Sequence, residues 1–307
     1  MLQHSVSLYV ATALIWGSTW YAIKFQLGVV APEVSLTYRF GLAAVILFAY
    51  CRLRGLNLRF SPEEHFYIGL QGLSLFCINY LIVYWATTLL ATGLIAVIFS
   101  TIVFMNILYS AIFFRQPVDA KVLGCALCGL AGITLVFWPE LSAFRIAGDG
   151  LRGMALSLLA TTIASLGTMV ATRNQNAKLP VVQTNAWGMT YGAVVMAIYA
   201  WWREVPFNYG PSTAYGVSLL YLSVFGSVLA FGSFLTLVGR IGADRAAYVM
   251  VLFPVIALII STYFESYRWS ASAVAGVALV LSGNLLILIN QGSAKRVFGL
   301  ASSRRAP

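Results

Sequence analysis

The chain has 307 residues, of which 60% are hydrophobic and only 9% are charged. Soluble domains carry about 25% charged residues, so the composition excludes an ordinary soluble protein and predicts a membrane protein with the lipid bilayer as its partner. The formal charge of +10 comes from 19 Lys and Arg against 9 Asp and Glu. These cations are scattered between apolar runs, so no nucleic-acid partner is expected.

Ten hydrophobic stretches of the sequence are long enough to cross a bilayer, which takes roughly 20 apolar residues in a helix. In chain order they cover residues 6–25, 33–51, 66–88, 92–114, 120–138, 150–172, 181–202, 212–238, 244–264 and 270–290. The first stretch has no cationic segment before it and no small-residue cleavage site, so we expect a retained helix and not a signal peptide.

The positive charges indicate the orientation of these spans, because cytoplasmic loops carry more Lys and Arg. With the N-terminus in the cytoplasm, thirteen cations fall on the cytoplasmic side and five on the opposite side. The sequence therefore predicts a multi-pass protein with both termini in the cytoplasm. One further cation, Arg39, falls inside a predicted span.

Two parts of the chain resemble each other in order and spacing. Residues 93–114 align with residues 243–264 at an offset of 150, and residues 124–136 align with residues 276–288 at an offset of 152. Each repeat holds five predicted spans, an odd number, so the second repeat must cross the membrane in the opposite sense. Inverted repeats of this kind are typical of transporters, with the substrate site near the midplane between the halves.

These patterns predict an all-α integral membrane protein with ten transmembrane helices, arranged as two inverted five-helix repeats around a central cavity. We place the first repeat at residues 1–145, the second at residues 146–294 and a basic cytoplasmic tail at residues 295–307.

Several segments carry a family resemblance: ALIWGSTWYAIK at 13–24, RFGLAAVIL from Arg39, RQPVDAKVLGCALCGLAGI from Arg115 and ESYRWSASAVAGVALVLSGN from Glu265. The chain resembles the EamA-domain branch of the drug/metabolite transporter superfamily and, within it, YddG-like amino-acid exporters. The resemblance implies a bacterial inner-membrane exporter whose cavity is lined by helices one to four and six to nine. The sixth predicted span departs from the pattern because it lacks the tryptophan that often mirrors Trp16.

Motifs for catalysis and cofactor binding are absent from the sequence. There is no nucleotide-binding P-loop pattern, and the pair Cys125 and Cys128 lies in an apolar span without a second pair of metal ligands. Together with Gly124 and Gly132, Cys128 is better explained as a face of small residues for close helix packing. We therefore expect no catalytic residue, metal or cofactor. Three functions are weighed: an amino-acid exporter, a broad-specificity efflux transporter and an integral membrane enzyme. The enzyme is the weakest of them.

All nine carboxylates lie at span ends or in loops. Proton-driven transporters commonly relay protons through carboxylates inside the membrane, so the sequence favours export driven by the gradient of the substrate itself. The alternative is a broad-specificity drug and metabolite efflux transporter, possibly proton-coupled.

Arg39 lies six residues into the second span from its external end, at a depth of about 9 Å for a rise of about 1.5 Å per residue. Two interpretations are open. The side chain could extend to the outer interface or pack against neighbouring carbonyl groups, or it could face the cavity and attract a substrate carboxylate.

Aromatic and polar side chains supply the other candidates for substrate contact. Polar tips inside the membrane should face the bundle interior, because in lipid they would lack partners. The candidates are Trp16, Trp20, Arg39, Asn79, Tyr80, Tyr84, Phe99, Ser100, Ser165, Thr168 and Tyr248. They predict contact with a small-molecule substrate, and the family resemblance implies that this is an aromatic or other hydrophobic amino acid or a related metabolite, exported by alternating access. The sequence indicates no oligomeric state.

Overall fold

Helices are the only regular elements in the part of the chain that the computed structural model describes, which comprises residues 2–26, 28, 30–90, 92–142, 148–210, 212–264 and 268–302. Within these ranges the side chains of residues 2–4, 20, 92, 93, 140 and 287–302 are not described. Helices are expected for this composition, because a helix satisfies its own backbone hydrogen bonds without water.

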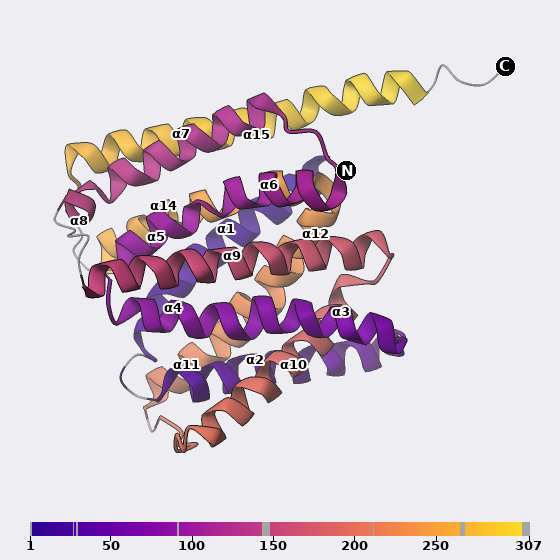
Figure 1. Cartoon of the computed structure of the whole chain (residues 1–307), viewed down its shortest axis with the longest axis vertical. Coiled ribbons are helices and arrows are strands. Elements are labelled where there is room, and N and C mark those ends of the chain that lie inside the picture. Colours follow the sequence, from indigo (N-terminus) through magenta and orange to yellow (C-terminus); the bar gives the residue numbers. More distant parts are fainter. Residues whose placement is uncertain are drawn as a thin grey trace.

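The first half of the chain forms five helical stretches and a short connecting helix (Figure 1). They are α1 (Leu2–Lys24), α2 (Pro32–Leu53), α3 (Pro62–Leu73) continued by the π-helix η1 (Ser74–Ile78) and α4 (Asn79–Thr87), α5 (Thr92–Ser100) followed by α6 (Ile102–Phe114), α7 (Ala120–Val136), and the short α8 (Trp138–Ser142).

The second half follows the same order. Its elements are α9 (Asp149–Asn176), α10 (Val181–Trp202), α11 (Thr213–Tyr221) continued by the π-helix η2 (Leu222–Leu229) and α12 (Ala230–Ile241), α13 (Ala243–Ala246) followed by α14 (Val249–Phe264), and α15 (Ala271–Ser302).

Seven helical stretches of the described chain are long and apolar enough to cross a membrane. They cover Ser5–Lys24, Pro32–Leu53, Pro62–Thr87, Leu94–Phe114, Asp149–Asn176, Thr213–Ile241 and Ala243–Phe264. The other three predicted spans fall on α7, α10 and α15, which are helical as well. That all ten cross the membrane stays a prediction.

The helices pack side by side, and helices of the first half contact the corresponding helices of the second half. α7 lies along α15 at one edge of the bundle, and α2 lies along α10 at the opposite edge (Figure 1). α1 contacts α12 and α14, while α9 contacts α4 and α6. The start of α1, the α2–α3 connection and the α9–α10 connection lie at one end of the bundle (Figure 1).

Glycines allow the closest helix contacts. A Cβ atom on Gly132 would lie 2.7 Å from the Gly276 carbonyl oxygen, so α7 and α15 meet backbone to backbone. Cys128 also belongs to this contact, since its Cβ lies 3.5 Å from the Cβ position of Gly283. The face of small residues predicted for α7 is therefore right for these two residues. For Gly124, whose Cβ position has no neighbour within 4 Å among the described residues, it stays a prediction.

Candidate functional site

Arg39 lies inside the helix bundle, with only 3% of its surface exposed. Its Nε donates to the Ser227 hydroxyl at 2.9 Å. Its Cζ lies 5.2 Å from the ring centroid of Tyr80 and 5.3 Å from that of Phe40. The side chain therefore packs between α2, α4 and η2. The interpretation in which it extends to the outer interface is wrong.

The charge of Arg39 has no anionic partner in the part of the chain that the structure describes. The bond from Nε to Ser227 is the only hydrogen bond that the side chain makes there, and the described ion pairs lie elsewhere. Burying a cation without an anion is costly. The remaining guanidinium N–H groups are suited to a planar carboxylate, which they can bind through two hydrogen bonds.

The π-helix η2 supplies the polar groups that hold this region together. The Ser227 hydroxyl donates to the Leu222 carbonyl at 3.0 Å, five residues back, and accepts from Arg39. The Gly226 carbonyl accepts from Trp16 Nε1 at 3.2 Å. A Cβ atom on Gly226 would lie 3.1 Å from Arg39 Nη2, so a larger residue there would crowd the guanidinium.

Aromatic rings surround the same place. The Trp16 ring lies 5.1 Å from the rings of both Phe231 and Phe234. The ring centroid of Phe76 lies 4.9 Å from that of Phe231 and 5.5 Å from that of Phe40.

Tyr84 also belongs here, because it follows Tyr80 by one turn of α4 and both side chains pack, half-buried, against the same core. We call Arg39, Trp16, Tyr80, Tyr84 and Ser227 the Arg39 cluster. Four of its five members are residues predicted from the sequence.

Asn79 precedes Tyr80 and is also buried, with 6% of its surface exposed. Its Oδ1 has no hydrogen-bond partner in the described structure. Buried polar atoms are normally paired, so this amide oxygen is available to accept a hydrogen bond from a solute.

The other predicted residues make their hydrogen bonds elsewhere. Ser165 donates to Asn106 Oδ1 at 2.5 Å, and Asn106 donates to the Ala243 carbonyl at 3.2 Å, which ties α9, α6 and α13 together. Tyr248 donates to the carbonyl of Val122.

Ser100 and Thr168 donate to carbonyls of their own helices, at 2.8 Å and 3.0 Å. Phe99 is half-buried against the core. Trp20 is the remaining predicted candidate, and its side chain lies outside the described part of the structure.

Sequence reasoning missed Ser227 and Gly226. The similarity of residues 73–76 to residues 222–225 marks where both π-helices begin. A serine and a glycine in an apolar run, however, give no signal that they face an arginine.

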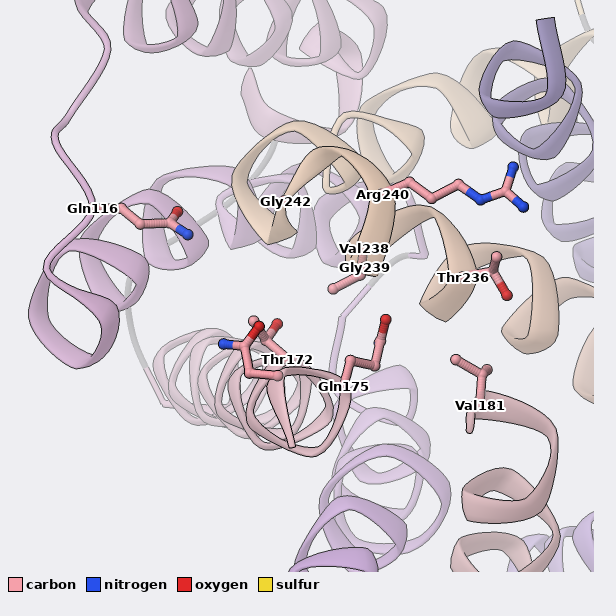
Figure 2. A pocket seen from close by; sticks show the side chains of 10 residues that line it. Gln116, Thr172, Gln175, Val181, Thr236, Val238, Gly239, Arg240 and Gly242 are labelled. Atoms are coloured by element: carbon pink, nitrogen blue, oxygen red, sulfur yellow. The ribbon is translucent and has the colours of Figure 1, made fainter. Parts of the chain in front are cut away.

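A cavity of about 420 Å³ lies at one end of the bundle. Figure 2 shows Thr172 and Gln175 pointing from the end of α9 toward the end of α12, where Thr236 and Gly239 lie, with Gln116 facing the same space. None of the predicted candidates lines this cavity. A cavity was expected at the centre of the bundle, whereas this one lies among helix ends.

A membrane-embedded helix bundle with a polar cavity at one end and a buried cation among aromatic rings has the properties of a membrane transporter. The sequence pattern of the EamA-like transporter family matches residues 4–138 and 151–289. The chain belongs to this family, within the drug/metabolite transporter superfamily, which confirms the resemblance seen in its sequence.

Individual relatives match over nearly the whole chain. Protein PagO of Salmonella typhimurium is 22% identical over 291 residues, covering 94% of each chain. The uncharacterized transporter YvbV of Bacillus subtilis is 26% identical over 282 residues, covering 89% of this chain and 88% of its own. The uncharacterized inner membrane transporter YedA of Escherichia coli is 25% identical over 278 residues, covering 88% of each chain.

One crystal structure of a protein has the same fold, with a TM-score of 0.78 and 17% sequence identity. The similarity covers 92% of this chain and 95% of that protein.

Proposed function

We propose that this transporter exports amino acids with aromatic or other hydrophobic side chains, and related small metabolites, across a bacterial inner membrane. The substrate carboxylate binds the free N–H groups of Arg39, and its apolar part packs among the rings of Trp16, Tyr80 and Tyr84. The observation that carries the proposal is the buried Arg39 guanidinium, which has one hydrogen bond and no anion among the described residues.

Alternating access between two inverted five-helix repeats is the mechanism that we propose. Reciprocal packing supports it: α2 contacts η2 as α10 contacts η1, and α1 contacts α14 as α9 contacts α6. Both π-helices occupy the same position in their halves. The inner-membrane location is supported by the relative YedA, which is described as an inner membrane transporter.

The distribution of acids supports export down the substrate gradient. The described carboxylates, among them Glu33, Asp149 and Asp244, lie in the first turns of their helices or in connections. A proton relay would need a carboxylate deeper in the bundle.

The test compares phenylalanine with phenylalaninamide in proteoliposomes, using the variants Arg39→Lys and Arg39→Gln normalised to protein level. Arg39→Lys keeps the charge and loses the planar fork that fits a carboxylate. We expect phenylalanine transport to fall about tenfold or more in both variants, as for loss of a charge-assisted hydrogen bond, while the amide is spared. An equal loss for both compounds at normal protein abundance would refute carboxylate recognition and favour broad efflux.

A further inference from the structure

The cavity at the bundle end has the size of a small-molecule binding site. Its volume is about 420 Å³, within the roughly 300–1,000 Å³ of small-molecule pockets. Its walls come from the ends of α9 and α12, the start of α10 and the segment after α6. Near the ends of both helices α12 and α9 touch, because a Cβ atom on Gly239 would lie 1.9 Å from Gln175 Oε1.

Apart from Arg240, the polar side chains that line this cavity are hydroxyls and neutral amides. Thr172 donates its hydroxyl to the Thr168 carbonyl at 2.9 Å, and Thr236 donates to the Gly232 carbonyl at 2.6 Å. Since each hydroxyl has one proton, both oxygens can only accept further bonds. The amide of Gln116 adds a donor and an acceptor. The lining can therefore bind an ammonium group and a carboxylate in the same space.

The described residues that line the cavity include no carboxylate that could pair with a solute that is a net cation. Of the described residues that line it, none is acidic, and one, Arg240, is basic. In Figure 2 the Arg240 side chain extends away from Gln116 and Thr172. Asp119 and Asp244 line a second, small hollow that shares Gln116 with the cavity. Asp119 is paired with Arg245 at 3.7 Å, and Asp244 Oδ1 lies 2.6 Å from the Cβ position of Gly242.

At the opposite end of the bundle, Gln26 occupies the sequence position that corresponds to Gln175. Gln26 follows Lys24 as Gln175 follows Arg173, each pair 149 residues apart in the sequence. Gln26 is 3% exposed, and its Nε2 has no hydrogen-bond partner, as is also true of Gln175 Nε2. Two equivalent glutamines, one lining a cavity and one enclosed, are the arrangement expected if the two ends open in turn.

We propose that the cavity between α9 and α12 is a cytoplasmic loading site, which binds the polar head of a net-neutral, zwitterionic solute before the solute reaches Arg39. The side of the membrane and the substrate class rest on the proposed function. The site itself rests on the cavity and its neutral polar lining. It selects zwitterions over organic cations, because its acceptors come without a carboxylate.

The first experiment measures protection from labelling in inside-out vesicles. Thr236→Cys places a thiol in the cavity, and the control Ala177→Cys places one on the exposed end of the same region. The native cysteines are buried or half-buried, so the unmodified protein gives the background with a membrane-impermeant maleimide. Phenylalanine at about ten times its dissociation constant should slow labelling of Thr236→Cys about tenfold, because about a tenth of the sites stay free.

Three outcomes would overturn the loading site: no protection, equal protection of Ala177→Cys, or equal protection by phenethylamine, which is a cation of similar size. A fourth arm repeats the measurement with Arg39→Gln added. Protection that persists shows binding at the cavity itself, whatever the transport assay finds for Arg39. Protection that disappears shows that the label reports on the Arg39 cluster, and the separate site is then refuted.

A second variant pair removes one acceptor without changing side-chain volume much. Thr236→Val should raise the half-saturating phenylalanine concentration in counterflow about fivefold, the loss expected for one hydrogen bond. Thr134→Val is the matched control, since Thr134 makes the same bond to the carbonyl four residues back, at 2.8 Å, on α7. Equal changes in both variants would contradict the proposal.

Discussion

At the scale of single residues, the hydroxyl of Ser227 links the backbone of a π-helix to the only cation buried deep in a described span. It donates to Leu222 and accepts from Arg39 Nε. The guanidinium Cζ also lies 5.2 Å from the ring centroid of Tyr80 and 5.3 Å from that of Phe40, so the bond to Ser227 holds the charged group beside these rings. Ser227 is therefore a positioning residue for Arg39.

Replacing Ser227 with alanine should lower phenylalanine counterflow about tenfold, because a hydrogen bond to a charged group contributes about 1.5–3 kcal/mol. Ser223→Ala is the control: Ser223 lies in the same π-helix, is buried, and donates to the Leu219 carbonyl at 2.8 Å. Transport is measured in proteoliposomes at equal protein content. Similar losses in the two variants would mean that Ser227 acts only through the helix backbone.

At the scale of elements, the bundle depends on places where two helices meet without side chains between them. α3 meets α10 in this way, because a Cβ atom on Gly72 would lie 2.2 Å from the Gly188 carbonyl oxygen. The neighbouring amides of Gln71, Asn174 and Asn185 connect α3, α9 and α10 through bonds of 3.0 Å and 3.2 Å. These three helices should therefore move as one unit.

Gly72→Ala should destabilise the protein by about 1–3 kcal/mol, the usual effect of overpacking, and lower its thermal unfolding temperature in detergent. Gly41→Ala should leave that temperature unchanged or raise it slightly, because the nearest atom to its Cβ position is Ala193 Cβ at 4.0 Å and alanine favours helix. If the two variants unfold alike, the α3–α10 contact is looser than the structure indicates.

At the scale of the whole molecule, the proposed inversion of the second half fixes the side of the membrane on which each connection lies. Reporter fusions after Gly55 and Asn176 should both be cytoplasmic, and a fusion after Tyr209 should be periplasmic. The expectation follows from the excess of cations on the cytoplasmic side and from the position of the α2–α3 and α9–α10 connections at the same end of the bundle (Figure 1). Opposite locations for Gly55 and Asn176 would show that five spans do not separate the repeats as proposed.

Energetics is also a property of the whole molecule. Without a carboxylate relay deep in the bundle, phenylalanine counterflow should proceed at an equal rate with and without a pH or sodium gradient. The measurement compares liposomes with matched and unmatched buffers on the two sides, and protein-free liposomes correct for leakage. A strict need for either gradient would contradict export driven by the substrate alone.

Sequence alone was sufficient for the features that depend on solvent and local pattern. The scarcity of charge predicts the membrane, and apolar stretches predict the helices, since lipid permits few other backbone structures. The repeated segments predict that α5–α6 corresponds to α13–α14, and the family follows from the same residues. Each of these depends on composition or on residues near one another in the chain.

Tertiary structure alone decided which polar groups meet. Arg39 bonds to a serine 188 residues away, and Trp16 to a carbonyl 210 residues away. The π-helix that presents both groups has no pattern distinct from an α-helix in sequence. Ser165 and Tyr248 look like equal candidates by residue type, yet they bond to Asn106 and Val122. An apolar helix can present any of its faces inward, and only the packing of all the helices together determines which polar side chains share a space.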